Sequence, residues 1–284
     1  MAPTTTSSGY RKERRQNKCP MINGLIVDAA ESQDAKVLLK VIAAHLEDMN
    51  LVNLTTGLHR VAKLFTDFHG IQALRQNGVA ESSRVLLAEM LSRIAGALRR
   101  SQAGLSPSRT HTVSNILWSL GALNLMHDEV LELIFVAISD NPKIFRPLEL
   151  ASALWGFARL SLAAAAASSS SSSQQPGCES RALSCASTTT SSISSSALQN
   201  PSTSNNNNNT NNNNQHTSAF VISVASHFAS KALDSVIAVL DDLSICSLSM
   251  VAWSAFVLVP SAPSEYFAAV AQRLVTGLRH GHCP

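Results

Sequence analysis

Apolar side chains recur every three or four residues along most of the chain, in stretches of helix length that Gly, Pro and polar residues separate. The alternating, β-branched pattern of a half-buried strand is scarce. The sequence therefore predicts an all-α fold. The expected helices lie near residues 34–48, 51–65, 80–100, 108–125, 127–139, 146–162, 219–240, 243–259 and 264–279.

A low-complexity segment interrupts this pattern between residues 163 and 218. It consists mainly of Ala, Ser, Thr and Asn, and its only Lys, Arg, Asp or Glu side chains are Glu179 and Arg181. Such a segment has too few large apolar side chains to offset the entropy lost on ordering. We therefore expect a disordered insert within one helical domain. The predicted divisions are a disordered basic N-terminus over 1–21, helical repeats over 22–162, the insert over 163–218, and further helical repeats over 219–284.

The three tryptophans occupy the same place in a short recurring motif. Trp118, Trp155 and Trp253 each follow an aliphatic residue or Ala and precede Ser or Gly, and His59 takes this place in a fourth copy. Trp118 and Trp155 are 37 residues apart, and Trp155 and Trp253 are 42 apart once the 56 residues of the insert are left out. A period of about 40 residues with two helices in each unit is typical of an α-solenoid.

A helical wheel separates two faces of this motif. With the Trp or His position as zero and 100° per residue, offsets −2, −1, +2, +3 and +5 form an apolar packing face. Offsets −3, +1 and +4 form a narrow polar stripe, and no Asp or Glu occupies it. The zero position lies at the border, where a tryptophan packs against the next unit more often than it binds a ligand. The stripe consists of Thr56, Arg60 and Lys63; Asn115, Ser119 and Ala122; Ser152, Gly156 and Arg159; and Met250, Ser254 and Val257.

Because the first helices of a solenoid lie side by side, their stripes are expected to merge into one binding surface. A polar stripe is otherwise only a solvated face, but scattered Arg and Lys without acids favour an anionic ligand. Over the whole chain the balance is mild, with 22 Lys and Arg against 19 Asp and Glu, a net charge of +3. Composition alone therefore does not indicate nucleic acid.

Residues 51–64, 112–118 and 148–155 resemble the repeats of a group of organellar proteins. These are the helical-repeat proteins of mitochondria and plastids that often carry a RAP domain, namely the FAST-kinase-like family and its octotricopeptide and heptatricopeptide relatives. The resemblance covers about 22–162 and 219–280, and the sequence shows no RAP domain. It implies binding of single-stranded organellar transcripts or ribosomal RNA, in RNA stability, processing or ribosomal RNA handling. A ribonucleoprotein or mitoribosomal assembly is the implied setting.

The first twenty residues are basic, with five Lys and Arg against the single acid Glu13. This composition fits an organellar transit peptide and equally a disordered basic tail. Together with the resemblance it predicts delivery to the mitochondrial matrix, with a plastid or the cytoplasm as alternatives.

The sequence contains no motif typical of catalysis or cofactor binding. The patterns GxxxxGK[ST], HExxH and GxSxG do not occur, so we expect neither an enzyme nor a bound cofactor. The five cysteines include no CxxC pair, and the cluster His280, His282 and Cys283 lacks a fourth metal ligand. We therefore expect no metal site. Residues 243–260 carry no charge, but they are short and include four serines, so we expect no membrane span.

The sequence leaves two functions open. The leading hypothesis is a non-catalytic RNA-binding protein, in which each repeat offers one or two side chains to single-stranded RNA. The alternative is a protein-binding scaffold like HEAT or armadillo repeats, which the apolar stripe residues Met250 and Val257 favour. The predicted RNA contacts are Arg60, Lys63 and Arg159 to phosphate, Asn115 and Ser152 to base edges, and Thr56, Ser119 and Ser254 as further hydrogen-bonding groups.

Overall fold

A computed structural model describes residues 8–66, 79–100, 107–138, 141–171 and 207–279. All regular structure in these ranges is helical, which confirms the all-α prediction there, and each of the nine expected helices has a counterpart. The helices are α1 (Ser8–Glu31), α2 (Ala35–His45), α3 (Leu51–Thr66), α5 (Val79–Arg99), α6 (Pro107–Leu123), α7 (Asp128–Ile138), α8 (Pro147–Ser171), α9 (Asn207–Ala238), α10 (Ile245–Leu258) and α11 (Ser264–Arg279), with 3-10 turns η1 (Leu46–Asp48), η2 (Pro142–Ile144) and η3 (Leu240–Asp242).

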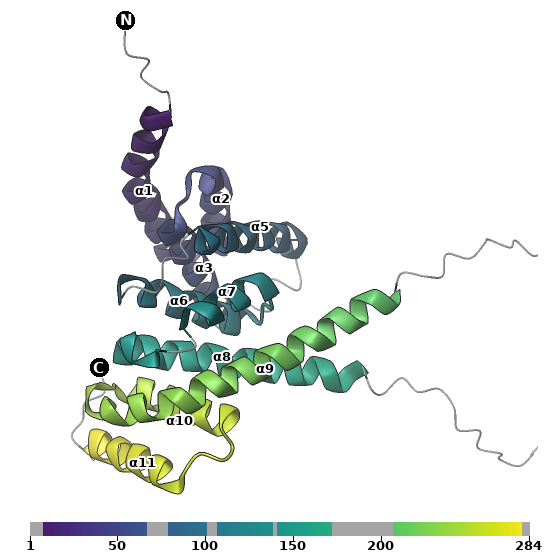
Figure 1. Ribbon diagram of the computed structural model, residues 1–284. Coiled ribbons are helices and arrows are strands. Elements are labelled where there is room, and N and C mark those ends of the chain that lie inside the picture. The colour runs from purple at the N-terminus through teal and green to yellow at the C-terminus, as the bar shows by residue number, and fades with distance from the viewer. Residues whose placement is uncertain (1–7, 67–78, 101–106, 139–140, 172–206, 280–284) are drawn as a thin grey trace, which may run out of the picture.

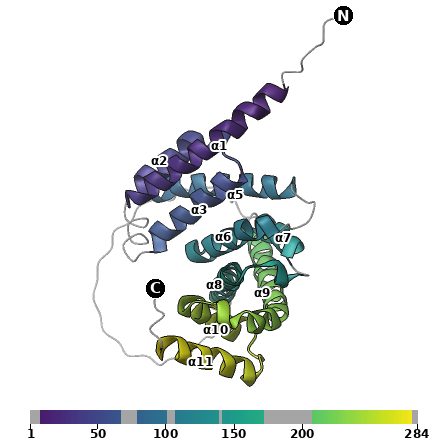
Figure 2. The ribbon, with the colours of Figure 1, turned by 90° about the vertical axis from the view of Figure 1, so that its left-hand side faces the viewer.

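The helices form two rows. In the first row α1, α3, α6, α8 and α10 each contact the next, and we call these the first helices. In the second row α5, α7, α9 and α11 do the same. Figure 2 shows the successive helices descending from α1 and α2 at the top to α10 and α11 at the bottom, and Figure 1 shows α9 crossing α8.

The core lies between the rows. Ile116 of α6, Ile134 of α7, Phe157 of α8 and Phe228 of α9 are each at most 1% exposed. The rings of Phe157 and Phe228 lie 5.5 Å apart between their centroids, so they join the two rows directly. One continuous cluster of buried side chains runs from α1 to α11, and this cluster holds the first helices in a fixed order.

The prediction of a disordered N-terminus over 1–21 is wrong from residue 8 onward, because α1 begins at Ser8. Residues 1–7 lie outside the described ranges. The second half of α1 buries Ile22 and Ile26 against α2 and α3, and residues 11–16 are mostly strong helix formers that extend the helix toward its start. The apolar spacing was present in the sequence, but Pro20 lies within the helix, and a proline at such a position usually indicates that a helix does not continue through it.

The helices on either side of the predicted insert extend into it. Helix α8 continues to Ser171, and Ala164 is only 2% exposed, so the start of the low-complexity segment belongs to the core. Helix α9 already begins at Asn207. Alanine is the strongest helix former, and it costs little side-chain entropy to bury, so an Ala run extends a packed helix without large apolar groups. Residues 172–206 lie outside the described ranges.

Within the described ranges, two helical stretches are long and apolar enough to cross a membrane by length and composition, Pro147–Ala167 and Ala219–Ala238. Each contributes to the core, since Phe157 and Phe228 belong to them. A buried core helix passes the same test, so these stretches are weak evidence for a membrane span.

Candidate nucleic-acid interface

The four equivalent positions of the repeat come together as a ladder of rings, His59, Trp118, Trp155 and Trp253. The ring centroids are 4.7 Å apart between His59 and Trp118, 5.7 Å between Trp118 and Trp155, and 6.5 Å between Trp155 and Trp253. The middle pair is stacked, with 25° between the ring planes. All four side chains are partly exposed. The rings therefore run along the surface of the first helices, and each packs on its neighbour as predicted for this position.

Two glycines set the close approach of α6 and α8. A Cβ added to Gly121 would lie 2.8 Å from the carbonyl oxygen of Gly156, and a Cβ on Gly156 would lie 2.5 Å from the carbonyl carbon of Leu117. Offset +3 of one first helix thus faces offset +1 of the next. The +1 position of α8 is therefore a contact between helices and not part of an open stripe.

This packing contradicts the prediction that Ser119 and Ser254 are exposed for binding. Both occupy offset +1 and are 0% exposed. The Ser119 hydroxyl donates to the Asn115 carbonyl at 2.6 Å, and the Ser254 hydroxyl donates to the Met250 carbonyl at 2.6 Å. Small side chains stand here because a neighbouring helix passes close by, and their hydroxyls are satisfied within their own helix.

The exposed stripe instead follows offsets −7, −3, 0 and +4. These four offsets lie within about 60° of one another on the helix. Every side chain on them is exposed or partly exposed except that of Ala122, and none is Asp or Glu. The residues of this observed stripe are Val52, Thr56, His59 and Lys63; His111, Asn115, Trp118 and Ala122; Leu148, Ser152, Trp155 and Arg159; and Cys246, Met250, Trp253 and Val257.

The observed stripe thus keeps five of the eight predicted contacts, leaves a sixth beside it on the helical wheel, and adds groups that the sequence analysis did not propose as contacts. Thr56, Asn115 and Ser152 are partly exposed at offset −3, and Lys63 and Arg159 are exposed at offset +4. The sixth contact, Arg60 at offset +1 of α3, is also partly exposed. The rings and His111 are the added groups. The periodicity of the motif could have predicted that these groups share the exposed side, since offsets 0 and −7 lie beside −3 and +4 on the helical wheel.

Positive charge lies directly against the ladder. The guanidinium carbon of Arg159 is 5.8 Å from the centroid of the Trp155 ring, within the range of a cation–π contact. Lys63 and Arg60 lie beside His59 at the other end. Burial, together with these two cations and His111, lowers the pKa of His59 from 6.5 to about 4. His59 is therefore neutral near pH 7 and packs against Trp118 as an uncharged ring, with 50° between the two ring planes.

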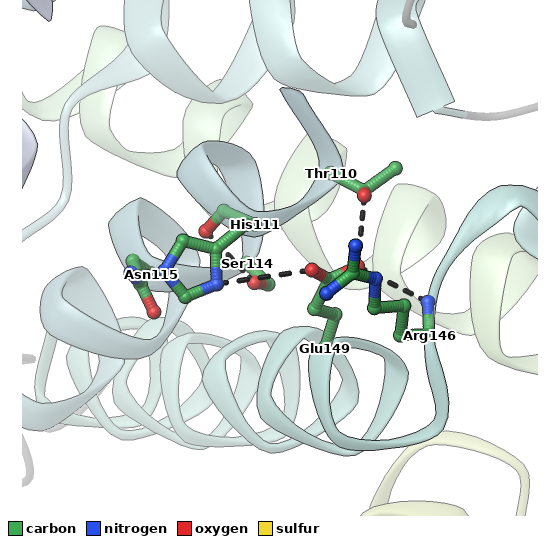
Figure 3. Close-up of polar contacts among 6 residues, drawn as sticks. All are labelled: Thr110, His111, Ser114, Asn115, Arg146 and Glu149. Atoms are coloured by element: carbon green, nitrogen blue, oxygen red, sulfur yellow. Dashed lines mark hydrogen bonds and ion pairs between the residues drawn. The ribbon is translucent and has the colours of Figure 1, made fainter. Parts of the chain in front are cut away.

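A buried carboxylate links α6 to the start of α8 and borders the stripe (Figure 3). Glu149 is 6% exposed, and its Oε2 accepts from the Thr110 hydroxyl at 2.8 Å and from the Arg146 backbone N–H at 3.1 Å. The second bond caps the first turn of α8. Glu149 Oε1 lies 3.7 Å from Nδ1 of His111.

The same cluster orients a predicted base-reading residue. Nε2 of His111 lies 3.1 Å from Nδ2 of Asn115, so Nδ2 donates to the ring nitrogen and Oδ1 stays available as an acceptor. The cluster connects the partly exposed amide of Asn115, through His111, to the buried carboxylate of Glu149. Oε2 of that carboxylate is occupied by the Thr110 hydroxyl and the Arg146 backbone N–H.

No family model, curated protein or solved structure matches this chain. The cluster His280, His282 and Cys283 lies outside the described residues, and among the described residues no group of three or more His, Cys, Asp or Glu could hold a metal ion.

Proposed function

We propose that this chain is a non-catalytic α-solenoid that binds single-stranded RNA along the stripe of its first helices. The observation that carries the proposal is the ladder itself: four partly exposed rings in one line, with Arg159 over Trp155 and no acid on the stripe. Grooves that bind single strands without a duplex combine exposed aromatic rings with positive charge along the backbone path.

The side chains divide into two roles in this proposal. Lys63 and Arg159 are exposed cations on the two sides of the ladder's centre and contact phosphates, and the partly exposed Arg60 adds a third cation near His59. Thr56, Asn115 and Ser152 line the other edge and offer hydrogen bonds to base edges. The ring edges between these two lines give every base an apolar contact that does not depend on sequence.

The same stripe carries the resemblance to the organellar RAP-associated repeat proteins, which supports an organellar RNA as the ligand. The basic N-terminal residues support delivery to mitochondria. A fusion of residues 1–40 to a fluorescent reporter tests this localisation, and we expect the fluorescence in mitochondria. Diffuse signal from both this fusion and the full chain would contradict it.

Crosslinking in cells, followed by sequencing of the RNA that is bound, tests the function. We expect one or a few enriched organellar transcripts or ribosomal RNA regions, in ribonucleoprotein or mitoribosomal fractions. The enrichment should fall in a variant with Lys63→Glu and Arg159→Glu. Recovery of no RNA above background would remove the proposal.

One observation favours protein binding as a second candidate. Offset −7 places Val52 and Leu148 on the stripe at 56% and 64% exposed, and Met250 and Val257 are partly exposed nearby in α10. Exposed apolar side chains in a line are typical of a groove that binds a partner helix. An intact chain that binds no RNA at any salt concentration would favour this HEAT- or armadillo-like scaffold.

A further inference from the structure

The last first helix, α10, exposes a face that every earlier repeat buries. Offsets −4, −1 and +3 are at most 4% exposed in α3, where they hold Thr55, Leu58 and Ala62, and they are likewise buried in α6 and α8. In α10 the same offsets hold Ser249, Ala252 and Phe256, which are exposed, partly exposed and 72% exposed. We call these three residues the open face.

The protein itself shows what covers such a face. Gly121 occupies offset +3 in α6, and the atoms nearest to its missing Cβ belong to Gly156 and Arg159 of α8. The cover is thus the next first helix, which presents a small residue at its point of closest approach. No described helix covers the open face.

The opposite end of the row carries a first helix whose outer side is free. On α1, Met21, Gly24, Leu25 and Asp28 lie at i, i+3, i+4 and i+7, so they share one side. Met21 is 55% exposed and Leu25 is 37% exposed. A Cβ at Gly24 would meet nothing within 4 Å, so a neighbouring helix could approach here as α6 approaches α8. We call this the free side of α1.

We propose that the open face of α10 binds the free side of α1 from a second copy of this chain. The contact is head-to-tail, so it leaves one open face and one free side at the two ends of each pair, and association continues with concentration. It would bring α1 of one copy to the place that a next first helix occupies within the array. This contact requires no RNA, and its test is independent of RNA binding.

Analytical ultracentrifugation of the RNA-free full chain tests the proposal. We expect the average mass of the wild type to rise steadily with concentration. Phe256→Glu at the open face and Leu25→Glu on the free side should each stay at the monomer mass. Val136→Glu, on α7 at a residue 79% exposed, is the matched control and should behave as wild type. Circular dichroism should show equal helicity in all four proteins.

Mixing the two variants tests whether the contact is head-to-tail or symmetric. Phe256→Glu keeps its free side and Leu25→Glu keeps its open face, so an equimolar mixture should form a one-to-one dimer and stop there. A Leu25→Glu variant that still dimerises alone would show that two open faces pair symmetrically. That result, or a wild type that stays monomeric at every concentration, would overturn the head-to-tail proposal.

Discussion

The backbone of Gly156 in α8 packs directly on the backbone of Leu117 in α6. A Cβ at Gly156 would come within 2.5 Å of the Leu117 carbonyl carbon and within 2.9 Å of the Trp118 nitrogen. Backbone atoms in two packed helices cannot give way as the end of a flexible side chain can. This contact therefore sets the spacing at which the Trp118 and Trp155 rings stack.

We predict that Gly156→Ala destabilises the fold by about 3 kcal/mol, at the upper end of the cost of overpacking. Gly24→Ala is the matched control, because a Cβ there meets nothing within 4 Å. Replacing Gly by Ala in an exposed helix stabilises it, by about 0.5–1 kcal/mol. Urea unfolding of both variants measures the difference. Equal stability of the two variants would mean that α6 and α8 are not in backbone contact.

The position of His59 in the ladder predicts a pH dependence of stability. The unfolded chain binds a proton at this histidine below about pH 6.5, whereas the folded chain does so only below about pH 4. Above about pH 6.5 the His59 ring is neutral in both states, and the stability that depends on the neutral ring is fully present. As the pH falls from 6.5 toward 4, only the unfolded chain gains the proton, so the free energy of unfolding decreases.

His59→Gln removes this titration and leaves the other histidines in place. We expect the melting temperature of the wild type to fall more steeply than that of the variant between pH 6.5 and 4. Parallel curves for the two proteins would show that the ring is accessible to protons in the folded state. The remaining histidines titrate in both proteins, so the difference between the two melting-temperature curves reports His59 alone.

A third prediction concerns the alanine run that continues α8. Ala164 is 2% exposed, whereas Ala165 next to it is exposed. A charged carboxylate cannot be buried among apolar side chains without a large cost. We therefore expect Ala164→Asp to lower the melting temperature strongly and Ala165→Asp to change it little. Thermal unfolding followed by circular dichroism measures both melting temperatures. An equally small decrease in the two variants would place this turn outside the core.

The buried carboxylate of Glu149 provides a fourth prediction. Glu149→Ala removes the contacts to the Thr110 hydroxyl and to the Arg146 backbone N–H, so we expect a loss of about 1–3 kcal/mol. Glu132→Ala on α7 is the control, because Glu132 is exposed and should change stability by less than about 0.5 kcal/mol. Chemical unfolding of both variants distinguishes a structural carboxylate from an ordinary surface acid.

The sequence located the repeat but not the face that it exposes. The recurrence of Trp118, Trp155 and Trp253, with His59 in the fourth copy, predicted four equivalent first helices, and each of these rings does contact the next. A helical wheel gives directions around one axis, but it does not give the distance to the neighbouring helices. Ser119 therefore looked like a polar surface group, although its small size reflected close packing at offset +1.

The start of the predicted insert and the first helix differ from the sequence pattern for a related reason. Pattern rules count apolar residues, whereas a helix once anchored by Ile22 or Phe157 continues through Ala, Arg or Lys at little cost. Cooperativity of the helix carries it beyond the part of the sequence that is amphipathic. The open face of α10 could not be recognised at all before the repeats were compared in three dimensions.

The most direct test of RNA binding by the stripe is its salt dependence. The affinity of the full chain for a single-stranded RNA should be measured by fluorescence anisotropy over a range of KCl concentrations. One variant carries Lys63→Glu and Arg159→Glu on the stripe. The other carries Lys36→Glu and Lys40→Glu, which reverses two exposed lysines on α2 and changes the net charge equally.

Each lost phosphate contact lowers the log–log salt slope by about 0.7 for a single strand. We predict a slope lower by about 1.4 and a much weaker affinity in the stripe variant, with both values nearly unchanged in the α2 variant. Equal weakening in the two variants would mean that only the net charge matters. Undiminished binding by the stripe variant, or no binding by the wild type at any salt concentration, would contradict the assignment of this surface to RNA.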